Sequence, residues 1–167
     1  RIVVATDDRR IAAAVQRFGG TAIMTRDDHP SGTDRLAEAA QDLDPATLVV
    51  NVQGDEPMIH PDDIDKAIAA ARLQDAEIVT LKTKLEDAQG NDPNRVKVVT
   101  DQNGMALYFS RSKIPSGGTC FLHVGLYVYR VGFLKKFTKL EAGPLERAER
   151  LEQLRALEHG YRIRVVE

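Results

Sequence analysis

The chain has 167 residues, of which 43% are hydrophobic and 29% charged, and its formal net charge is −2. This length predicts one domain, residues 1–167, and the nearly balanced charge argues against nucleic acid as the main partner. A single cysteine excludes an intrachain disulfide and is typical of a reducing compartment. No apolar run approaches the roughly 20 residues of a membrane-spanning helix, so we expect no membrane partner.

The first half of the chain alternates short apolar segments with amphipathic ones. Strands are predicted over residues 2–5, 21–24, 48–52 and 78–81, with helices beginning near Asp7, around Leu36 and at Pro61. In the first helix, Ile11 and Val15 share one face, and a Gly-Gly pair follows. This alternation predicts an α/β fold with a mainly parallel, Rossmann-like sheet and helices on both faces.

The pattern changes after Asp87. The segments 96–99 and 105–109 are rich in apolar and β-branched or aromatic residues and flank an Asn-Gly pair, which is typical of an antiparallel hairpin. Further elements are predicted as a strand over 123–129, a short helix over 133–140, a longer helix over 145–159 and a last strand over 161–166. We therefore expect residues 94–140 to form an inserted hairpin region.

A polar segment directly follows the most apolar strand: Asn51-Val52-Gln53-Gly54-Asp55-Glu56-Pro57. In open α/β sheets, ligands bind beyond the carboxyl ends of the strands, so Asp55 falls at the mouth of the expected site. A carboxylate there suits Mg²⁺, which binds through one or two carboxylates plus substrate phosphates. The alternative is an acidic turn that only caps the next helix, and composition alone leaves both interpretations open.

A small, hydroxyl-rich turn lies before the predicted second helix. Ser31 and Thr33 offer hydroxyls to a ligand, and Gly32 permits close approach of the backbone. The same hydroxyls are typical N-caps, which satisfy the first N–H groups of a helix. Composition favours the N-cap, although adjacent residues can serve both purposes.

The second half of the chain holds further candidates. Arg111, at the end of a predicted strand, suits a carboxylate or phosphate. Glu152 and Gln153 suit sugar hydroxyls from a helix surface, and His123 lies on a predicted strand. The alternatives are a strand-edge salt bridge for Arg111 and a solvated helix face for the other pair, and the residues alone favour these alternatives.

As a set, these segments resemble the CMP-Kdo synthetase (3-deoxy-manno-octulosonate cytidylyltransferase) family. The resemblance rests on residues 3–8, 31–35, 51–57, 96–99, 106–111, 114–115, 123–127 and 151–155, in this order. It covers nearly the whole chain, and the run of motifs is highly specific. It implies a nucleotidyltransferase fold and raises the functional interpretation of each segment above its alternative.

The resemblance also implies an activity and the residues that perform it. The family transfers CMP from CTP to Kdo with release of pyrophosphate, for lipopolysaccharide biosynthesis in the cytoplasm, as a homodimer that meets in the hairpin region. It implies nucleotide binding by Ser31, Gly32, Thr33 and Gln53, Mg²⁺ binding by Asp55, catalytic roles for Asp55 and Arg111, and sugar binding by Arg111, His123, Glu152 and Gln153.

The sequence departs from the family pattern at three places. No basic, glycine-containing phosphate loop precedes Arg1, no second metal-binding aspartate follows Glu167, and the segment 114–119 is shorter than the family's loop. We therefore expect a polypeptide of only these residues to be inactive or nearly so. Two alternatives stay open: a different acidic sugar, such as 8-amino-Kdo or sialic acid, and a non-catalytic remnant that binds a nucleotide or a partner chain.

Overall fold

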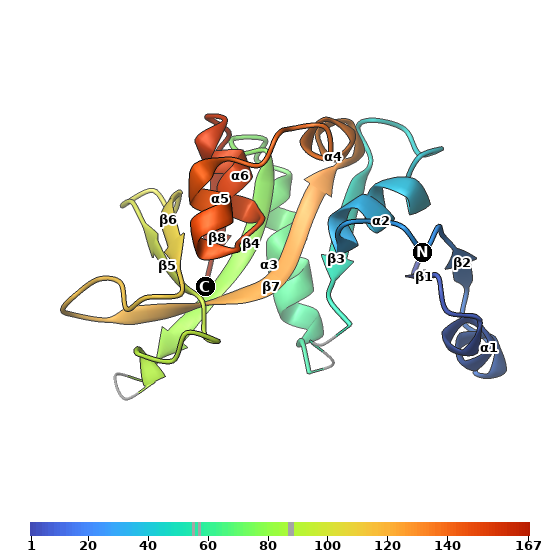
Figure 1. The fold of residues 1–167 in the computed structure, drawn as a ribbon, viewed down its shortest axis with the longest axis horizontal. Helices are drawn as coiled ribbons and strands as arrows, with labels where there is room; N and C mark the ends of the chain where they lie inside the picture. The colour runs from blue at the N-terminus through green and yellow to red at the C-terminus, as the bar shows by residue number, and fades with distance from the viewer. Residues whose placement is uncertain (55, 57, 87–88) are drawn as a thin grey trace.

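The computed structural model describes residues 1–54, 56, 58–86 and 89–167, which form an α/β fold with two sheets (Figure 1). The strands are β1 (Val4–Thr6), β2 (Ala22–Met24), β3 (Leu48–Val52), β4 (Ile78–Leu85), β5 (Lys97–Thr100), β6 (Ala106–Ser110), β7 (Cys120–Arg130) and β8 (Ile163–Val166). The helices are α1 (Arg9–Arg17), α2 (Gly32–Ala39), α3 (Pro61–Ala71), α4 (Val131–Phe137), α5 (Pro144–Glu149) and α6 (Gln153–Glu158). The predicted α/β class is confirmed.

The two sheets differ in size and position. The smaller one pairs β1 with β2 in parallel, and α1 joins them. The larger one has the order β6-β5-β7-β4-β8, with β3 also paired to β7. The β1–α1–β2 unit and the β5–β6 hairpin lie at opposite ends of the molecule (Figure 1).

Strand direction in the larger sheet corrects the prediction of a mainly parallel sheet. β7 is antiparallel to both β3 and β4, whereas β8 is parallel to β4. Thus β3, β4 and β8 run the same way, as strands joined by helices usually do, but β7 inserts between β3 and β4 and makes most neighbouring pairs antiparallel. Apolar composition indicates that a strand is buried and does not identify its neighbours.

Helices cover both faces of the larger sheet, as predicted. On one face, Ala67 of α3 shares a buried cluster with Val79 and Leu126. On the other face, Leu134 of α4 shares a second cluster with Ile78. Because Ile78 and Val79 are consecutive in β4, their side chains point to opposite faces, and each face carries its own apolar core.

The predicted hairpin is confirmed, since β5 and β6 pair antiparallel with Val98 opposite Phe109. At its turn, the Asp101 carboxylate accepts from the backbone N–H groups of Asn103 and Met105, each at 2.8 Å. No helix within the described ranges is long and apolar enough to cross a membrane. The single-domain assignment of residues 1–167 and the dimer role of residues 94–140 stay predictions.

The prediction of one helix over 145–159 is wrong. The chain forms α5 and α6 instead, and between them Arg150 adopts a left-handed conformation with φ 55° and ψ 48°. Leu151 and Leu154 are buried, as expected from their spacing. The break therefore lies in a segment whose apolar periodicity continues, and its cause is tertiary contact rather than a local glycine or proline.

Candidate functional site

A cavity of about 390 Å³ brings together four of the predicted site residues. Gln53 follows β3, His123 belongs to β7, and Glu152 and Gln153 lie where α6 begins. The other residues around this larger cavity are Glu56, Asn94, Arg95, Val96, Leu122, Gly125, Tyr127 and Leu151. Segments that are far apart in the sequence therefore build one cavity beside the end of β3, with polar and apolar residues in its lining.

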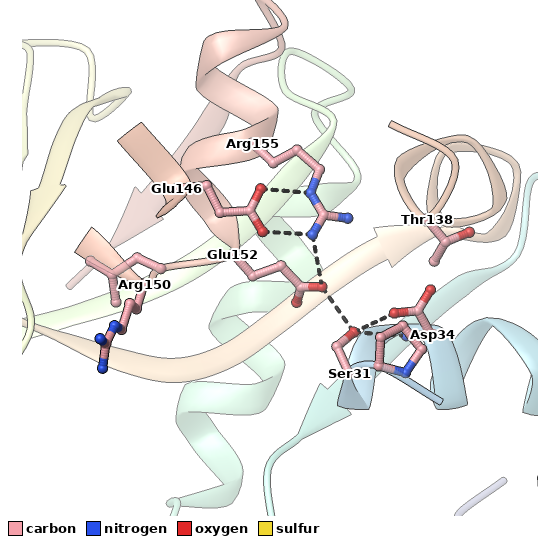
Figure 2. A pocket seen from close by; sticks show the side chains of 9 residues that line it. Ser31, Asp34, Thr138, Glu146, Arg150, Glu152 and Arg155 are labelled. Carbon is pink, nitrogen blue, oxygen red and sulfur yellow. Dashed lines mark hydrogen bonds and ion pairs between the residues drawn. The ribbon is translucent and has the colours of Figure 1, made fainter. Parts of the chain in front are cut away.

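A second cavity of about 320 Å³ adjoins the first, because Leu151 and Glu152 line both. Figure 2 shows Ser31 and Asp34, from the start of α2, facing Glu146, Glu152 and Arg155 from the α5–α6 segment. This smaller cavity is lined by Pro30, Ser31, Asp34, Thr138, Glu146, Arg150, Leu151, Glu152 and Arg155. Its walls carry charges of both signs, as do those of the larger cavity.

Glu152 connects the turn at the start of α2 to the larger cavity. Its two carboxylate oxygens lie 2.9 Å from the Ser31 hydroxyl and 2.5 Å from the Thr33 hydroxyl. The Thr33 hydroxyl donates to Glu152, whereas the one proton of Ser31 is shared with Asp34, whose Oδ2 lies 2.6 Å away. Ser31 also caps α2 by accepting from the Asp34 N–H, so its predicted N-cap role is confirmed.

Arg155 supports Glu152 from the other side. Its guanidinium binds Glu146 through two hydrogen bonds of 2.8 and 2.6 Å and lies 3.9 Å from Glu152. The bidentate pair is largely shielded from water, with 14% of the Arg155 side chain and 13% of the Glu146 side chain exposed. This geometry fixes the Arg155 fork, and it keeps a positive charge near the Glu152 carboxylate.

Gln53 lies beside Gly32 of the α2 turn and Gly125 of β7. A Cβ atom at Gly32 would lie 3.7 Å from Gln53 Oε1, and one at Gly125 would lie 3.6 Å from Gln53 Cγ. Gly125 also lies beside Glu56, because the same added atom would be 3.7 Å from its Oε1. The predicted nucleotide-binding residues of the α2 turn and Gln53 are therefore neighbours.

His123 is neutral near pH 7 and presents an acceptor. Burial lowers its pKa from 6.5 to about 4. Its Nε2 lies 2.9 Å from the Thr80 hydroxyl, which in turn donates to the Leu126 carbonyl at 2.7 Å. Since the Thr80 proton is used on that carbonyl, Nε2–H donates to Thr80 and Nδ1 is left as an acceptor. An acceptor of this kind suits a ligand hydroxyl.

Arg111 lies outside the described linings of both cavities. Its guanidinium donates to the backbone carbonyls of Glu149 at 2.8 Å, Pro93 at 3.1 Å and Arg150 at 3.4 Å. The structure thus brings Gln53, His123, Glu152 and Gln153 together and leaves Arg111 outside both linings, with three of its five N–H groups bonded to backbone carbonyls. Its predicted catalytic and sugar-binding roles stay predictions.

Arg95 is the cation among the described residues that line the larger cavity. Its side chain is 42% exposed and its Nε lies 3.8 Å from an Asp92 carboxylate oxygen, so it can turn toward a ligand. Sequence reasoning missed Arg95, together with Asn94 and Glu56. The signal available was position alone, since Asn94 and Arg95 end a polar loop just before the hairpin and Glu56 is adjacent to Asp55.

The predicted metal and catalytic residue Asp55 lies outside the described residues. Elsewhere, the part of the chain that the structure describes has no group of three or more His, Cys, Asp or Glu residues placed to hold a metal ion. Mg²⁺ commonly needs only one or two protein carboxylates when substrate phosphates complete its shell. Glu56 lines the larger cavity, so oxygen donors of the required kind are present next to Asp55.

Comparison with known proteins gives a consistent result. The family model described as "Cytidylyltransferase" matches residues 1–163. A 3-deoxy-manno-octulosonate cytidylyltransferase from Syntrophotalea carbinolica is 54% identical over 183 positions, covering 100% of this chain and 73% of that protein. One from Solibacter usitatus is also 54% identical, covering 99% of this chain and 68% of that protein. The 183 aligned positions exceed the 167 residues, so the first relative has residues without a counterpart here.

Among solved structures, a CMP:2-keto-3-deoxy-manno-octonic acid synthetase complexed with CTP has the same fold. It superposes with a TM-score of 0.93 and is 42% identical in sequence. The superposition covers 100% of this chain and 73% of that one.

Proposed function

This chain belongs to the cytidylyltransferase family, and on that basis we propose that it transfers CMP from CTP to 3-deoxy-manno-octulosonate (Kdo) with release of pyrophosphate. The observation that carries the proposal is the larger cavity, where Gln53, His123, Glu152 and Gln153 meet. Amide, imidazole and carboxylate groups that converge on a concave site suit a polyhydroxylated sugar acid.

The reaction needs positioning more than covalent work from the protein. A hydroxyl oxygen of Kdo attacks the α-phosphorus of CTP and loses its proton, while the bond from that phosphorus to the bridging oxygen breaks and pyrophosphate leaves. Such transfers depend mainly on alignment and on neutralising charge. Gly32 and Gln53 hold the nucleotide at the α2 turn, and the larger cavity holds the sugar, so the two reactants meet near Glu152.

Four polar residues of the larger cavity have roles that fit a sugar acid. Glu152 and the neutral His123 accept hydrogen bonds from sugar hydroxyls. Gln153 is 95% buried, at 5% exposure, and its amide both donates and accepts. Arg95 supplies the positive charge that faces the sugar carboxylate, because its guanidinium fork matches a carboxylate in geometry.

We also propose that Mg²⁺ is held by Asp55 together with the triphosphate. Support comes from Glu56, which adds a second carboxylate at the same end of β3. When bound, Mg²⁺ polarises the phosphates and stabilises the leaving pyrophosphate. The protein residues need only supply oxygen donors and an open position for the nucleotide.

Assembly and location complete the proposal. We propose a homodimer through residues 94–140. Leu107 on the edge strand β6 is 62% exposed, which supports this surface. Sedimentation velocity tests the oligomeric state. We also propose that the protein acts in the cytoplasm, which suits the free cysteine Cys120.

Pyrophosphate release tests the function directly. Protein of determined intact mass is mixed with CTP and Mg²⁺, and with Kdo, 8-amino-Kdo or sialic acid in parallel. Release that requires Kdo is the expected result. If pyrophosphate is released only with one of the other sugars, that sugar is the substrate in place of Kdo. CTP binding without any release, in protein longer than these residues, would overturn the enzymatic proposal in favour of a nucleotide-binding remnant.

A further inference from the structure

The guanidinium of Arg111 has all of its nitrogens in use within the protein. Nε, Nη1 and Nη2 donate to the carbonyls of Glu149, Pro93 and Arg150, respectively. Two of these carbonyls belong to the junction between α5 and α6, and the third belongs to the loop before β5. These bonds use three of the five N–H groups of the guanidinium and hold it against the backbone of the α5–α6 junction. The geometry therefore favours a structural tie over a direct ligand contact.

The Glu149 side chain, at the end of α5, makes the reciprocal contact with the end of β6. Its carboxylate accepts from the Ser110 hydroxyl at 2.6 Å and from the Arg111 backbone N–H at 2.9 Å. Burial alone would raise its pKa, but these hydrogen bonds hold the pKa below its usual value, so Glu149 is ionised near neutral pH. Arg111 and Glu149 are thus joined twice, once through each side chain, at the end of β6.

The tie lies where α5 changes direction into α6. Arg150 has a left-handed backbone that side-chain-bearing residues rarely adopt, and its carbonyl is one of the groups that Arg111 holds. Directly beyond it, Leu151 is buried and Glu152 and Gln153 line the larger cavity. In a continuous helix, Glu152 and Gln153 would point away from their present directions into the larger cavity, because each residue advances about 100° around a helix axis.

We propose that Arg111 and Glu149 are positioning residues, which hold the α5–α6 junction so that Glu152 and Gln153 face the sugar substrate. This inference rests on the proposed function, since it takes the sugar acid as the ligand of the larger cavity. Neither Arg111 nor Glu149 belongs to the described lining of that cavity. Both act on the substrate through the backbone of the junction.

Two variants separate positioning from direct contact. Arg111→Gln and Glu149→Gln each raise the KM for Kdo about tenfold or more, while the KM for CTP changes less than about twofold. The double variant is no worse than either single one, because both break the same tie. Arg111→Lys does not rescue, since a single ammonium cannot span three carbonyls.

Arg130→Gln is the matched control. Arg130 also donates to two backbone carbonyls, of Ala46 at 3.1 Å and Ala71 at 3.3 Å, and it lies outside both cavity linings. This variant lowers stability and leaves the KM for Kdo unchanged. A rise in that KM in Arg111→Gln but not in Glu149→Gln would overturn the proposal, because it indicates that Arg111 contacts the sugar itself.

Amide hydrogen exchange gives a readout that needs no substrate. In the protein without ligand, both variants speed exchange at Leu151 and Leu154, whose N–H groups bond to Glu146 and Leu151 carbonyls. Unchanged exchange there would overturn the positioning role even if Kdo is the substrate. If the wild-type protein does not use Kdo, the proposed function fails, and the exchange rates still decide whether Arg111 and Glu149 hold the junction.

Discussion

The Thr33 hydroxyl donates a 2.5 Å hydrogen bond to the Glu152 carboxylate, although the two residues are 119 positions apart in the sequence. Thr33 belongs to the turn assigned to the nucleotide, and Glu152 belongs to the cavity assigned to the sugar. The direct bond makes the position of one group depend on the other. Occupancy of the nucleotide turn can therefore change how the carboxylate meets the sugar.

Thr33→Val should weaken sugar binding while the fold persists, because it removes a donor at nearly constant size. A hydrogen bond to a charged group contributes about 1.5–3 kcal/mol, so we expect the KM for Kdo to rise about tenfold or more. Steady-state pyrophosphate release measures this KM. Thr83→Val, on the exposed part of β4, is the control. In combination with Glu152→Gln, the effects should be less than additive; full additivity would contradict the coupling.

Arg95→Gln should raise the KM for Kdo about fivefold and leave the KM for CTP unchanged, since an exposed charge pair contributes up to about 1 kcal/mol. Its effect should shrink at high ionic strength, because salt screens exposed charges. Arg72→Gln makes the same charge change on an exposed residue that lines neither cavity. An equal loss of CTP affinity would assign Arg95 to the nucleotide instead.

Stability should fall as the pH drops from about 6.5 toward about 4, because His123 stays neutral in the folded protein and takes a proton when unfolded. In this window the unfolded state binds the extra proton, which costs up to about 1.4 kcal/mol per pH unit. Urea unfolding at several pH values measures the slope. His123→Gln should flatten it, and parallel curves for the variant and the wild type would disprove this assignment.

Asp55→Asn should abolish pyrophosphate release and spare the fold, because it removes one charge at constant size. Mg²⁺ affinity in the presence of CTP should fall with it, since the amide is a weaker ligand for a hard cation. Isothermal titration with Mg²⁺ measures that loss, and a thermal melt provides the check on folding. Full turnover in Asp55→Asn would refute the metal role.

Lys97→Met should destabilise the protein by about 1–3 kcal/mol. The Lys97 side chain is fully buried, and its ammonium donates to the carbonyls of Asp92 at 2.9 Å and Arg111 at 2.5 Å. Methionine fills a similar volume but leaves both carbonyls without this donor. Urea unfolding measures the loss, and the exposed Lys139→Met should stay within about 0.5 kcal/mol of wild type. Equal midpoints for the two variants would contradict this account.

Much of the fold could be predicted because its signals are local. Apolar segments of strand length and the Asn103-Gly104 turn predict β3 and the β5–β6 hairpin without tertiary information. Gln53, His123 and Glu152 converge on one cavity, and they could be predicted as site residues only through the family resemblance. Composition alone favoured the N-cap at Ser31 and did not favour a ligand.

The remaining features depend on contacts between distant segments. Nothing in the spacing of Leu151 and Leu154 indicates that the helix breaks at Arg150, because the break is held by Arg111 from another strand. Likewise, Arg95 has no motif of its own and becomes a cavity residue only because β5 pairs with β7. Local pattern predicts which elements form, whereas chain-distant hydrogen bonds decide where they end and meet.

The insertion of β7 between β3 and β4 constrains the order in which the protein can assemble during synthesis. Leu48 of β3 pairs with Arg130 and Ile78 of β4 pairs with Tyr129, so neither strand has this partner until β7 has left the ribosome. Long-range pairing of this kind slows folding and leaves apolar strands exposed for longer. The pairing of β3 and β4 with β7 can therefore be completed only after residue 130 has emerged.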